Sequence, residues 1–492
     1  INTGTGFVLD LTSNGGTYTP NLATTAFTPT GGSNTTFTAT TNYNFTGTGK
    51  IRATNFNLSA ATEVNVGAGT TLEATTISGT VNLGGVGTID PTSTFIYNYR
   101  DPLSTTSNNV IAPVTLNTNR NLGNVHVARG GLKVAGANLG FLNGNPTSTL
   151  LIGTTATPNA ANSDSSNVGF TVTSGTTDQV LTLSRGIDFS QTLTGFIGRQ
   201  RLTFDSSLTA DTSTLTIGGS IALPNTAGRN VRQEFTVLRS DQVLSLTGQI
   251  TGNNSSGFLI NGGNSGLGSV RLSNTTSTFS VPITVVMGSL LVANNVAFSG
   301  ASALGTSASV TLADGATPAA SLNSNPAFLI DGAFTVNRGL NLSNAASSGV
   351  PNSYVIGGNT AAISTFSGNV TVSPNANADK LLRLTQVAGG TVTFSGVINP
   401  NADASKVLDV EKIGAGKVIL TGANTYDGDT TVTEGILEIG VASNFANASD
   451  IRLTTGSNLA LTVSGTDTVA ALFIDGVAQL GGLYDSSNSG GA

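Results

Sequence analysis

Cysteine is absent from the 492 residues, and histidine occurs once, as His126. Without cysteine, disulfides, thiolate metal sites and a cysteine nucleophile are excluded. With a single histidine, a histidine metal cluster is excluded, and a Ser-His-Asp triad would have to use His126. This residue lies between Val125 and Val127 in the stretch NVHVARG, which predicts an outward-facing side chain on a β-strand. The sequence therefore predicts no metal site and no cofactor.

Charged residues are also sparse, at 9% of the chain, and the net charge is −6. A nucleic-acid partner would require a basic stripe that neutralises phosphates, so the composition argues against this class of partner. The densest acidic pair is Asp427 and Asp429 in YDGDT, and the turn-forming residues around them account for both. Because an active site needs convergent titratable groups, we predict that the protein is not an enzyme.

Long hydrophobic runs are missing as well. No stretch approaches the roughly 18 to 20 apolar residues that are needed to cross a bilayer, so we predict no transmembrane segment. The chain begins at Ile1 with neither an initiator methionine nor a signal-like segment. We interpret it as a mature or trimmed product.

Glycine, serine, threonine and asparagine dominate what is present, and the apolar 38% of the chain occurs in short alternating groups. In TISGTVNLGG, at 76–85, Ile77, Val81 and Leu83 alternate with polar residues. This period of two is typical of strands with one buried face, so we predict a folded, all-β protein. Helical periodicity is almost absent, and the best helix candidate is VASNFANASD at 441–450.

The strand-turn-strand pattern recurs along the chain. At one constant offset, LTGQI at 246–250 aligns with FSGVI at 394–398, and GLGSVRL at 266–272 aligns with GAGKVIL at 414–420. A single unit of this size cannot bury its apolar face alone, and stacking of neighbouring units solves that problem. The repeats therefore predict a solenoid.

One copy of the repeat, GAGKVILTGANTYDGDTTVTEGILEIG at 414–440, resembles the autotransporter-associated β-strand repeat. The motif positions are occupied by Gly414, Gly416, Val418, Leu420, Gly422, Asn424, Thr425, Tyr426, Gly428, Thr430, Val432, Gly435 and Leu437. The segment 464–492 is similar to the closing segment that follows such repeats in large secreted bacterial surface proteins. The resemblance implies an elongated, right-handed parallel β-helix of the passenger type, located extracellularly or on the bacterial cell surface.

Stacked parallel coils place strands about 4.8 Å apart and direct alternate side chains inward. The alternating apolar sites of the repeat are therefore expected to form its core: Val418, Leu420, Val432 and Leu437.

An aromatic stretch, STFIYNYRDP at 93–102, places Phe95, Tyr97 and Tyr99 on one face of a strand. These rings could stack on sugars or form an assembly contact, but we favour the alternative that they cover a domain junction. The proline and the polar run that follow predict a boundary here. We expect an N-terminal β-rich segment or cap at 1–102, a β-solenoid with degenerate repeats at 103–440 and a C-terminal cap at 441–492.

The open ends of a solenoid expose unpaired backbone groups that must be capped or paired. Either end segment could cap its own end, which we favour, or add a strand to a neighbouring molecule. The N-terminal residues for strand exchange are Phe7, Val8, Leu9 and Leu11. We therefore predict a structural or adhesive surface protein that forms a homo-oligomer or homopolymer and contacts glycans or matrix; the alternative is a glycan-binding or glycan-cleaving β-helix module.

Overall fold

The structure of the chain is a computed structural model in which 1–258 and 259–492 form two compact units, described separately below. Nearly all regular structure consists of short strands. Within the described residues, helix is confined to a 3-10 turn at Gly136–Asn138 and to α1 at Leu139–Asn143. The structure describes residues 8–10, 16–18, 35–38, 42–45, 50–53, 55–57, 63–75, 80–84, 87–98, 114–118, 120–145, 147–153, 166–172, 179–189, 198–206, 212–225, 231–253, 257–261, 268–307, 309–313, 325–343, 352–373, 379–441, 445–463 and 465–484.

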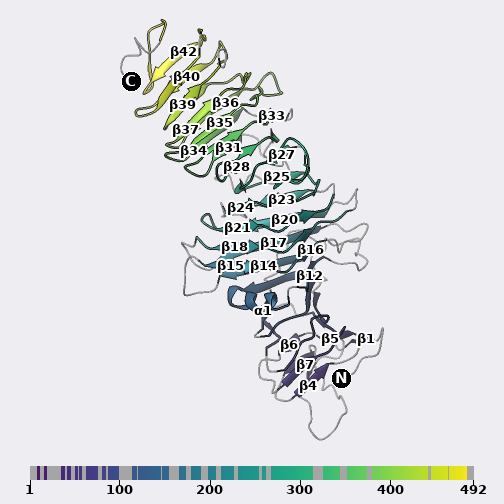
Figure 1. Cartoon of the computed structure of the whole chain (residues 1–492). Helices are drawn as coiled ribbons and strands as arrows, with labels where there is room; N and C mark the ends of the chain where they lie inside the picture. Colours follow the sequence, from purple (N-terminus) through teal and green to yellow (C-terminus); the bar gives the residue numbers. More distant parts are fainter. Residues whose placement is uncertain are drawn as a thin grey trace. The chain divides into compact units, whose positions relative to one another are not determined.

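Strands of the first unit pair in parallel with strands one coil further along the chain. Ile51 pairs with Leu72, and Leu72 pairs with Phe95. Parallel neighbours need a long connection, and here the connection runs through the other faces of the same coil. The unit is therefore a parallel β-helix, coloured purple to teal in Figure 1.

In the described residues of the first unit, the strands form four ladders. One runs through β1 (Val8–Asp10), β5 (Lys50–Ala53), β8 (Thr71–Ala74), β10 (Thr94–Asn98), β12 (Asn124–Ala135), β13 (Leu150–Ile152), β16 (Ile187–Asp188), β19 (Ile221–Ala222) and β22 (Ile250–Thr251). A second runs through β2 (Gly16–Tyr18), β3 (Thr35–Thr38), β6 (Asn55–Asn57), β9 (Thr80–Asn82), β11 (Val114–Asn117), the second half of β12, β14 (Ser166–Val172), β17 (Gly198–Ser206) and β20 (Val231–Val237). The short ladders are β4 (Asn42–Phe45) with β7 (Glu63–Val66), and β15 (Val180–Leu183), β18 (Thr214–Ile217) and β21 (Val243–Leu246).

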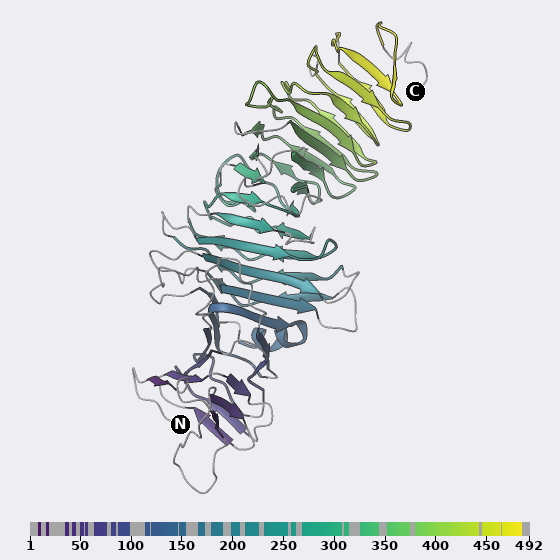
Figure 2. The same cartoon turned by 180° about the vertical axis from the view of Figure 1, so that it is seen from behind.

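The second unit, teal to yellow in Figures 1 and 2, follows the same plan, with three ladders among its described residues. The first is β24 (Ser269–Leu272), β26 (Ser289–Val292), β28 (Ala327–Ile330), β31 (Asn352–Gly358), β34 (Lys380–Gln386), β36 (Leu408–Ile413), β38 (Thr430–Val432), β40 (Asp450–Leu453) and β42 (Ala471–Ile474), with β43 (Val477–Ala478) antiparallel to β42. The second is β25 (Ile283–Val285), β27 (Ser309–Leu312), β30 (Gly339–Leu342) and β33 (Val370–Val372). The third is β29 (Thr335–Val336), β32 (Ile363–Phe366), β35 (Thr391–Phe394), β37 (Lys417–Leu420), β39 (Ile436–Ile439) and β41 (Asn458–Leu461).

The length of a coil follows from the register of the third ladder. Lys417 pairs with Ile436, and Ile436 pairs with Asn458, so successive coils take 19 and 22 residues (436 − 417 and 458 − 436). The parallel ladders confirm the predicted all-β solenoid. The division between the two compact units falls inside β23 (Phe258–Asn261), and the segment boundaries placed at 102 and 440 remain predictions.

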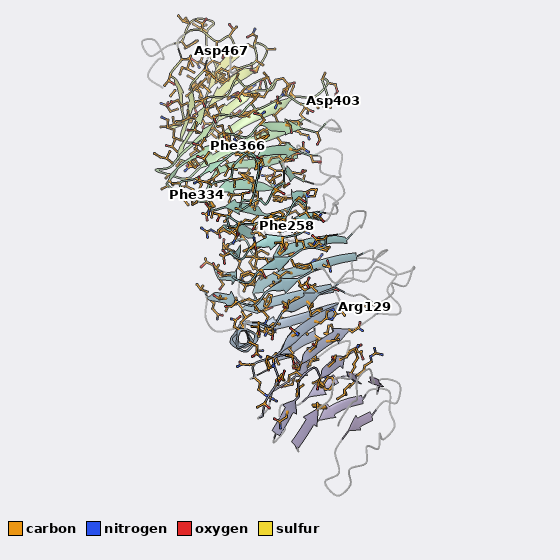
Figure 3. The ribbon with its side chains drawn as sticks, turned by 45° about the vertical axis from the view of Figure 1, so that its right-hand side comes forward. Arg129, Phe258, Phe334, Phe366, Asp403 and Asp467 are labelled. Carbon is orange, nitrogen blue, oxygen red and sulfur yellow. The ribbon has the colours of Figure 1, made fainter. Side chains whose placement is uncertain are left out.

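Inward-facing side chains stack in columns along each ladder. Phe366, Phe394, Leu420 and Ile439 follow one another in register, and none is more than 1% exposed. Burying a side chain of this size contributes about 1.5–3 kcal/mol to the stability of the folded chain. The sum over a column therefore holds these coils together. Figure 3 labels Phe366 among the stacked coils and Asp403 at their outer edge. The core positions predicted within the repeat are confirmed: Val418, Leu420, Val432 and Leu437 are fully buried.

Glycines of the repeat turn the chain at the corners between sheets. Gly414 and Gly435 have φ values of 75° and 69°, which other residues rarely adopt. A β-carbon at Gly435 would also lie 2.5 Å from the carbonyl oxygen of Gly416 in the previous coil. Close stacking and left-handed backbone thus both require glycine at this position.

Candidate functional site

Aspartate side chains at one outer corner of 408–450 join successive coils. Oδ1 of Asp427 accepts a hydrogen bond from the backbone N–H of Leu408 at 3.0 Å. Oδ1 of Asp409 accepts one from the N–H of Asp429, and Oδ1 of Asp429 accepts one from the N–H of Asp450, both at 2.8 Å. The turn accounts for Asp427 and Asp429 as expected, and each of them also connects two coils.

The electrostatics of this corner are partly unfavourable and partly compensated. Burial raises the pKa of Asp409, as do the charges of Asp429 and two further aspartates, although the N–H of Asp429 opposes the rise. Arg452 offsets the charge further along: its Nη2 donates to Oδ2 of Asp450 at 2.6 Å, and its Nε lies 3.3 Å from Oδ2 of Asp429. The guanidinium also lies over the ring of Phe473, 4.4 Å from the centroid.

Lys412 is a buried cation that donates hydrogen bonds to carbonyl groups, whereas the aspartates accept hydrogen bonds. Nζ of Lys412 donates to three backbone carbonyls, those of Ile413, Gly414 and Glu434, at 2.9, 2.6 and 3.0 Å. Burial lowers the pKa of Lys412 to about 8. The ammonium therefore satisfies backbone acceptors where the chain turns out of β36.

Tyr426, from the motif's Asn-Thr-Tyr turn, is buried, and its hydroxyl lies 2.9 Å from Oγ1 of Thr430. Burial raises the pKa of this phenol. Oδ1 of Asn424 accepts the backbone N–H of Ile398 at 2.9 Å, so this motif residue also connects two coils. Both motif side chains thus act in packing.

The comparison with protein families agrees with this geometry. Residues 410–439 match the family model described as passenger-associated-transport-repeat. The chain carries an autotransporter passenger repeat. Such a repeat is found in secreted or cell-surface proteins, and the passenger region is the surface-exposed part. No curated protein and no solved structure matched the chain.

In the first unit, which lacks the clear passenger-repeat motif, a buried carboxylate holds three coils. Oε2 of Glu73 lies 2.7 Å from Nζ of Lys50, and its Oε1 accepts hydrogen bonds from Arg52 Nε and Asn98 Nδ2, both at 2.9 Å. Burial alone raises the pKa of Glu73, but the hydrogen bonds and charges of its partners outweigh it and hold the pKa below its usual range. Sequence reasoning missed this cluster because its members lie on three strands.

Arg185 is a second side chain that joins coils, and the sequence did not indicate this role. Its guanidinium is fully buried and donates to the carbonyl oxygens of Leu122, Gly123 and Leu142. Burial lowers the pKa of Arg185 to about 10. The side chain reaches coils 43 to 63 residues away in sequence, so no local pattern could predict its role.

His126 faces outward from β12 and is half-buried, as its position between two buried valines predicts. Its Nε2 lies 2.5 Å from the carbonyl oxygen of Gly153, so Nε2 carries the proton and donates a hydrogen bond to that carbonyl. Burial lowers the pKa of the imidazole. Nε2 is therefore committed to a backbone hydrogen bond.

For two of the three aromatic residues, the structure corrects the suggestion that the ring contacts a sugar or another subunit. Phe95 and Tyr97 are buried, because β10 places them in line with the inward-facing Leu72 and Ala74 of the previous coil. Neither ring presents a surface to a sugar or to another subunit. Tyr99 lies outside the described residues.

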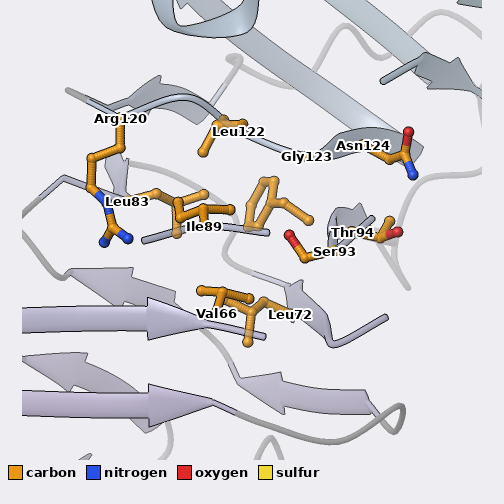
Figure 4. Close-up of a pocket in the computed structure, with 11 residues that line it drawn as sticks. Val66, Leu72, Leu83, Ile89, Ser93, Thr94, Arg120, Leu122, Gly123 and Asn124 are labelled. Atoms are coloured by element: carbon orange, nitrogen blue, oxygen red, sulfur yellow. The ribbon is translucent and has the colours of Figure 1, made fainter. Parts of the chain in front are cut away.

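A small cavity of about 20 Å³ lies beside Phe95. Figure 4 shows Val66, Leu72 and Leu122 around it, with Ser93 as a polar neighbour. This volume accommodates about one water molecule and is too small for a sugar ring. The cavity is therefore a small gap in the packing of the core.

Of the residues named for strand exchange, Val8 and Leu9 lie in β1, and Phe7 and Leu11 lie outside the described residues. Leu9 pairs in parallel with Ile51 of the same chain. Exchange between molecules remains a prediction.

Among the described residues, no group of three or more histidine, aspartate or glutamate side chains is arranged to hold a metal ion. In the same residues, no helix has the length and hydropathy of a membrane span.

Proposed function

We propose that this passenger protein is a non-enzymatic structural and adhesive component of the cell exterior, and that it assembles with copies of itself through strand pairing at its ends. The passenger repeat supports the exterior location. The end-to-end assembly extends, between molecules, the parallel pairing that joins coils within each unit.

One observation carries the proposal: the polar residues of the best-matched repeat are engaged in joining coils. Asp427 and Asp429 accept backbone N–H groups of other coils, and Lys412 donates to three carbonyls. A general acid or base must instead reach a substrate proton. The chemistry of these side chains therefore supports a scaffold.

The test is a deletion of residues 1–10, which removes β1, compared with the intact chain. We expect the intact protein to form oligomers whose mass rises with concentration in light scattering, and filaments or sheets in electron microscopy. The truncated protein should remain smaller, because it lacks a strand that pairs with the next molecule. Strict monomers of the intact chain over a wide concentration range would contradict the assembly, as would equal assembly by the truncated form.

A further inference from the structure

Two short excursions leave the regular coils, one in each unit, and each lies against a strand that begins a ladder. Residues 136–145, which include α1, lie against β15, which pairs on one side with β18. Residues 294–306 lie against β29, which pairs on one side with β32. The other edge of such a strand presents backbone groups that a strand of another chain could bind.

In the first unit, a side-chain amide stands where a neighbouring strand would lie. Nδ2 of Asn143 donates to the carbonyl oxygen of Thr182 at 2.6 Å, and its Oδ1 accepts the N–H of Ser184 at 2.7 Å. A residue of a parallel neighbour likewise donates to one backbone carbonyl and accepts an N–H group further along the same strand. The amide of Asn143 therefore reproduces the hydrogen bonds of a parallel strand on β15.

The same excursion also packs on the core side of β15. A β-carbon at Gly136 would lie 3.1 Å from both terminal methyl carbons of Leu181. Leu181 is in register with Leu215 and Leu244, which are fully buried in the following coils. The excursion thus covers the beginning of an inner column as well as the backbone edge beside it.

In the second unit, a backbone segment of the excursion occupies the edge of β29. Oδ1 of Asn295 accepts the N–H of Thr335 at 2.8 Å. The N–H of Val296 donates to the carbonyl oxygen of Thr335 at 2.9 Å, and the carbonyl of Val296 accepts the N–H of Asn337 at 2.7 Å. Three edge groups of β29 are therefore bonded to the excursion, and Val336 between them is fully buried.

A buried arginine holds each excursion in place. Arg185, directly after β15, donates to the carbonyl oxygen of Leu142, the residue before Asn143 in α1. Arg338, directly after β29, is 1% exposed. Its guanidinium donates to the carbonyl oxygens of Phe298, Gly300 and Gly305. In both units, the arginine thus anchors the excursion close to the residues that cover the edge.

Both arginines occupy a position at which later coils have glycine. Gly219 and Gly248 follow Arg185 in the stack, and Gly368 follows Arg338. A β-carbon at Gly219 would lie 2.1 Å from the carbonyl oxygen of Arg185, and one at Gly368 would lie 1.9 Å from that of Arg338. Regular stacking leaves no room for a side chain there, so an arginine fits only where an excursion replaces the preceding regular coil.

We infer that the two excursions are edge caps: residues 136–145 and 294–306 each occupy the strand edge at which a ladder begins and withhold it from a strand of another chain. The contact is autoinhibitory, because a strand that pairs with β15 must displace Asn143, and one that pairs with β29 must displace Val296. This role concerns edges inside the chain and is separate from the proposed assembly through β1.

The first experiment removes the edge cap of β15 in the full chain. Asn143→Ala combined with Arg185→Met deletes the amide and its anchor, so the N–H of Ser184 should exchange with solvent at least about tenfold faster. Gly140→Ala is the matched control, because this residue lies in the same helix and a β-carbon there meets no atom within 4 Å. The control should exchange as the unmodified protein does, and circular dichroism should show both variants folded.

A second measurement tests whether the uncovered edge accepts a strand. The probe is a fluorescent peptide with the sequence of residues 212–219, which contains β18, a parallel partner of β15. Fluorescence anisotropy should show that the double variant binds this peptide at least about tenfold more tightly than the unmodified protein, whose edge is occupied. The same peptide with Thr216→Pro lacks a backbone donor and should bind to neither protein.

Faster exchange together with peptide binding would establish the edge cap. Faster exchange without peptide binding would mean that the excursion only braces the fold, and it would overturn the inference, as would unchanged exchange in the folded double variant. If the double variant does not fold, Asn143→Ala alone must show smaller increases in both measurements, and their absence would also overturn the inference. Assembly of the unmodified protein is measured separately, so the proposed function stands or falls on its own.

Discussion

The coils of the passenger repeat at 410–439 and the coils around Glu73 in the first unit share parallel ladders but are joined by different polar side chains. In the repeat, aspartates accept backbone N–H groups and Lys412 donates to carbonyls. Around Glu73, an ion cluster joins side chains to one another across three strands. The fold therefore requires satisfied polar groups at its surface and corners, but it does not require one particular residue type to satisfy them.

The two regions also differ in whether the charges around a carboxylate stabilise or destabilise it. The partners of Glu73 hold its pKa below the usual range, whereas the neighbours of Asp409 raise the pKa of that carboxyl. A carboxylate that faces cations stabilises the folded chain, and one that faces other carboxylates destabilises it. Substitutions in both regions test how far this difference matters.

The largest effect is expected in the shared inner columns. Leu420→Asp in the repeat and Leu72→Asp in the first unit should each destabilise their unit by about 4 kcal/mol or more, because each buries an unpaired charge. Urea unfolding followed by circular dichroism measures the change. An unchanged midpoint for one variant would show that the two regions do not depend on their columns equally.

Arg185 and Lys412 test whether buried cations play the same role in both regions. Arg185→Met should lower the free energy of unfolding by about 3 kcal/mol, since the carbonyls of three residues lose their donor. Lys412→Met should cost less, because Lys412 makes three hydrogen bonds to carbonyls whereas Arg185 makes four. Equal losses in urea unfolding would contradict this ranking.

The pH dependence of stability should reveal Lys412 directly. Its folded-state pKa of about 8 lies below the ordinary value of 10.5, so the folded chain loses this proton first as the pH rises. Stability should therefore increase between pH 8 and about 10.5, by up to about 3 kcal/mol, since each unit of difference between the folded and unfolded pKa corresponds to about 1.4 kcal/mol. Thermal melts of the unmodified protein and of Lys412→Met across this range check the sign, and the variant should show a flatter profile.

The smallest effects concern the two carboxylates, and their signs should differ. Asp409→Asn keeps an acceptor for the N–H of Asp429 and removes repulsion, so it should stabilise the protein at neutral pH by up to about 1 kcal/mol. The raised pKa means that the carboxylate is unfavourable once ionised, so this gain should disappear in acid. Asp409→Ala, which removes the acceptor, is the control and should destabilise.

Glu73→Gln is the matched change in the first unit and should destabilise at neutral pH. Because the pKa of Glu73 is lowered, its contribution is present above the ordinary carboxyl pKa and is lost as the pH falls through the folded value. Melting curves from pH 7 into the acid range should therefore show opposite changes for Asp409→Asn and Glu73→Gln at pH 7, and both changes should shrink as the pH falls. A loss of stability at pH 7 for both variants would mean that charge does not separate the two regions.

The sequence by itself determined the all-β solenoid, its repeat and the core of that repeat. The reason is local: a period of two, corner glycines and the motif at 414–440 can all be read within one coil, and stacking then follows from the need to bury one face. The helix expected at 441–450 is absent from its described residues, 441 and 445–450, whereas α1 at Leu139–Asn143 was not expected. Such short segments carry too little periodicity to be predicted.

Only the tertiary structure decided which face of STFIYNYRDP is buried and which polar groups join the coils. Alternation defines two faces of a strand but does not say which one meets the core, and the neighbouring columns of Leu72 and Ala74 turn Phe95 and Tyr97 inward. The partners of Glu73 lie 21 to 25 residues away, and those of Arg185 lie up to 63 away. Contacts between coils depend on the register of whole ladders, which is set by many pairings at once and cannot be read from any single stretch of the chain.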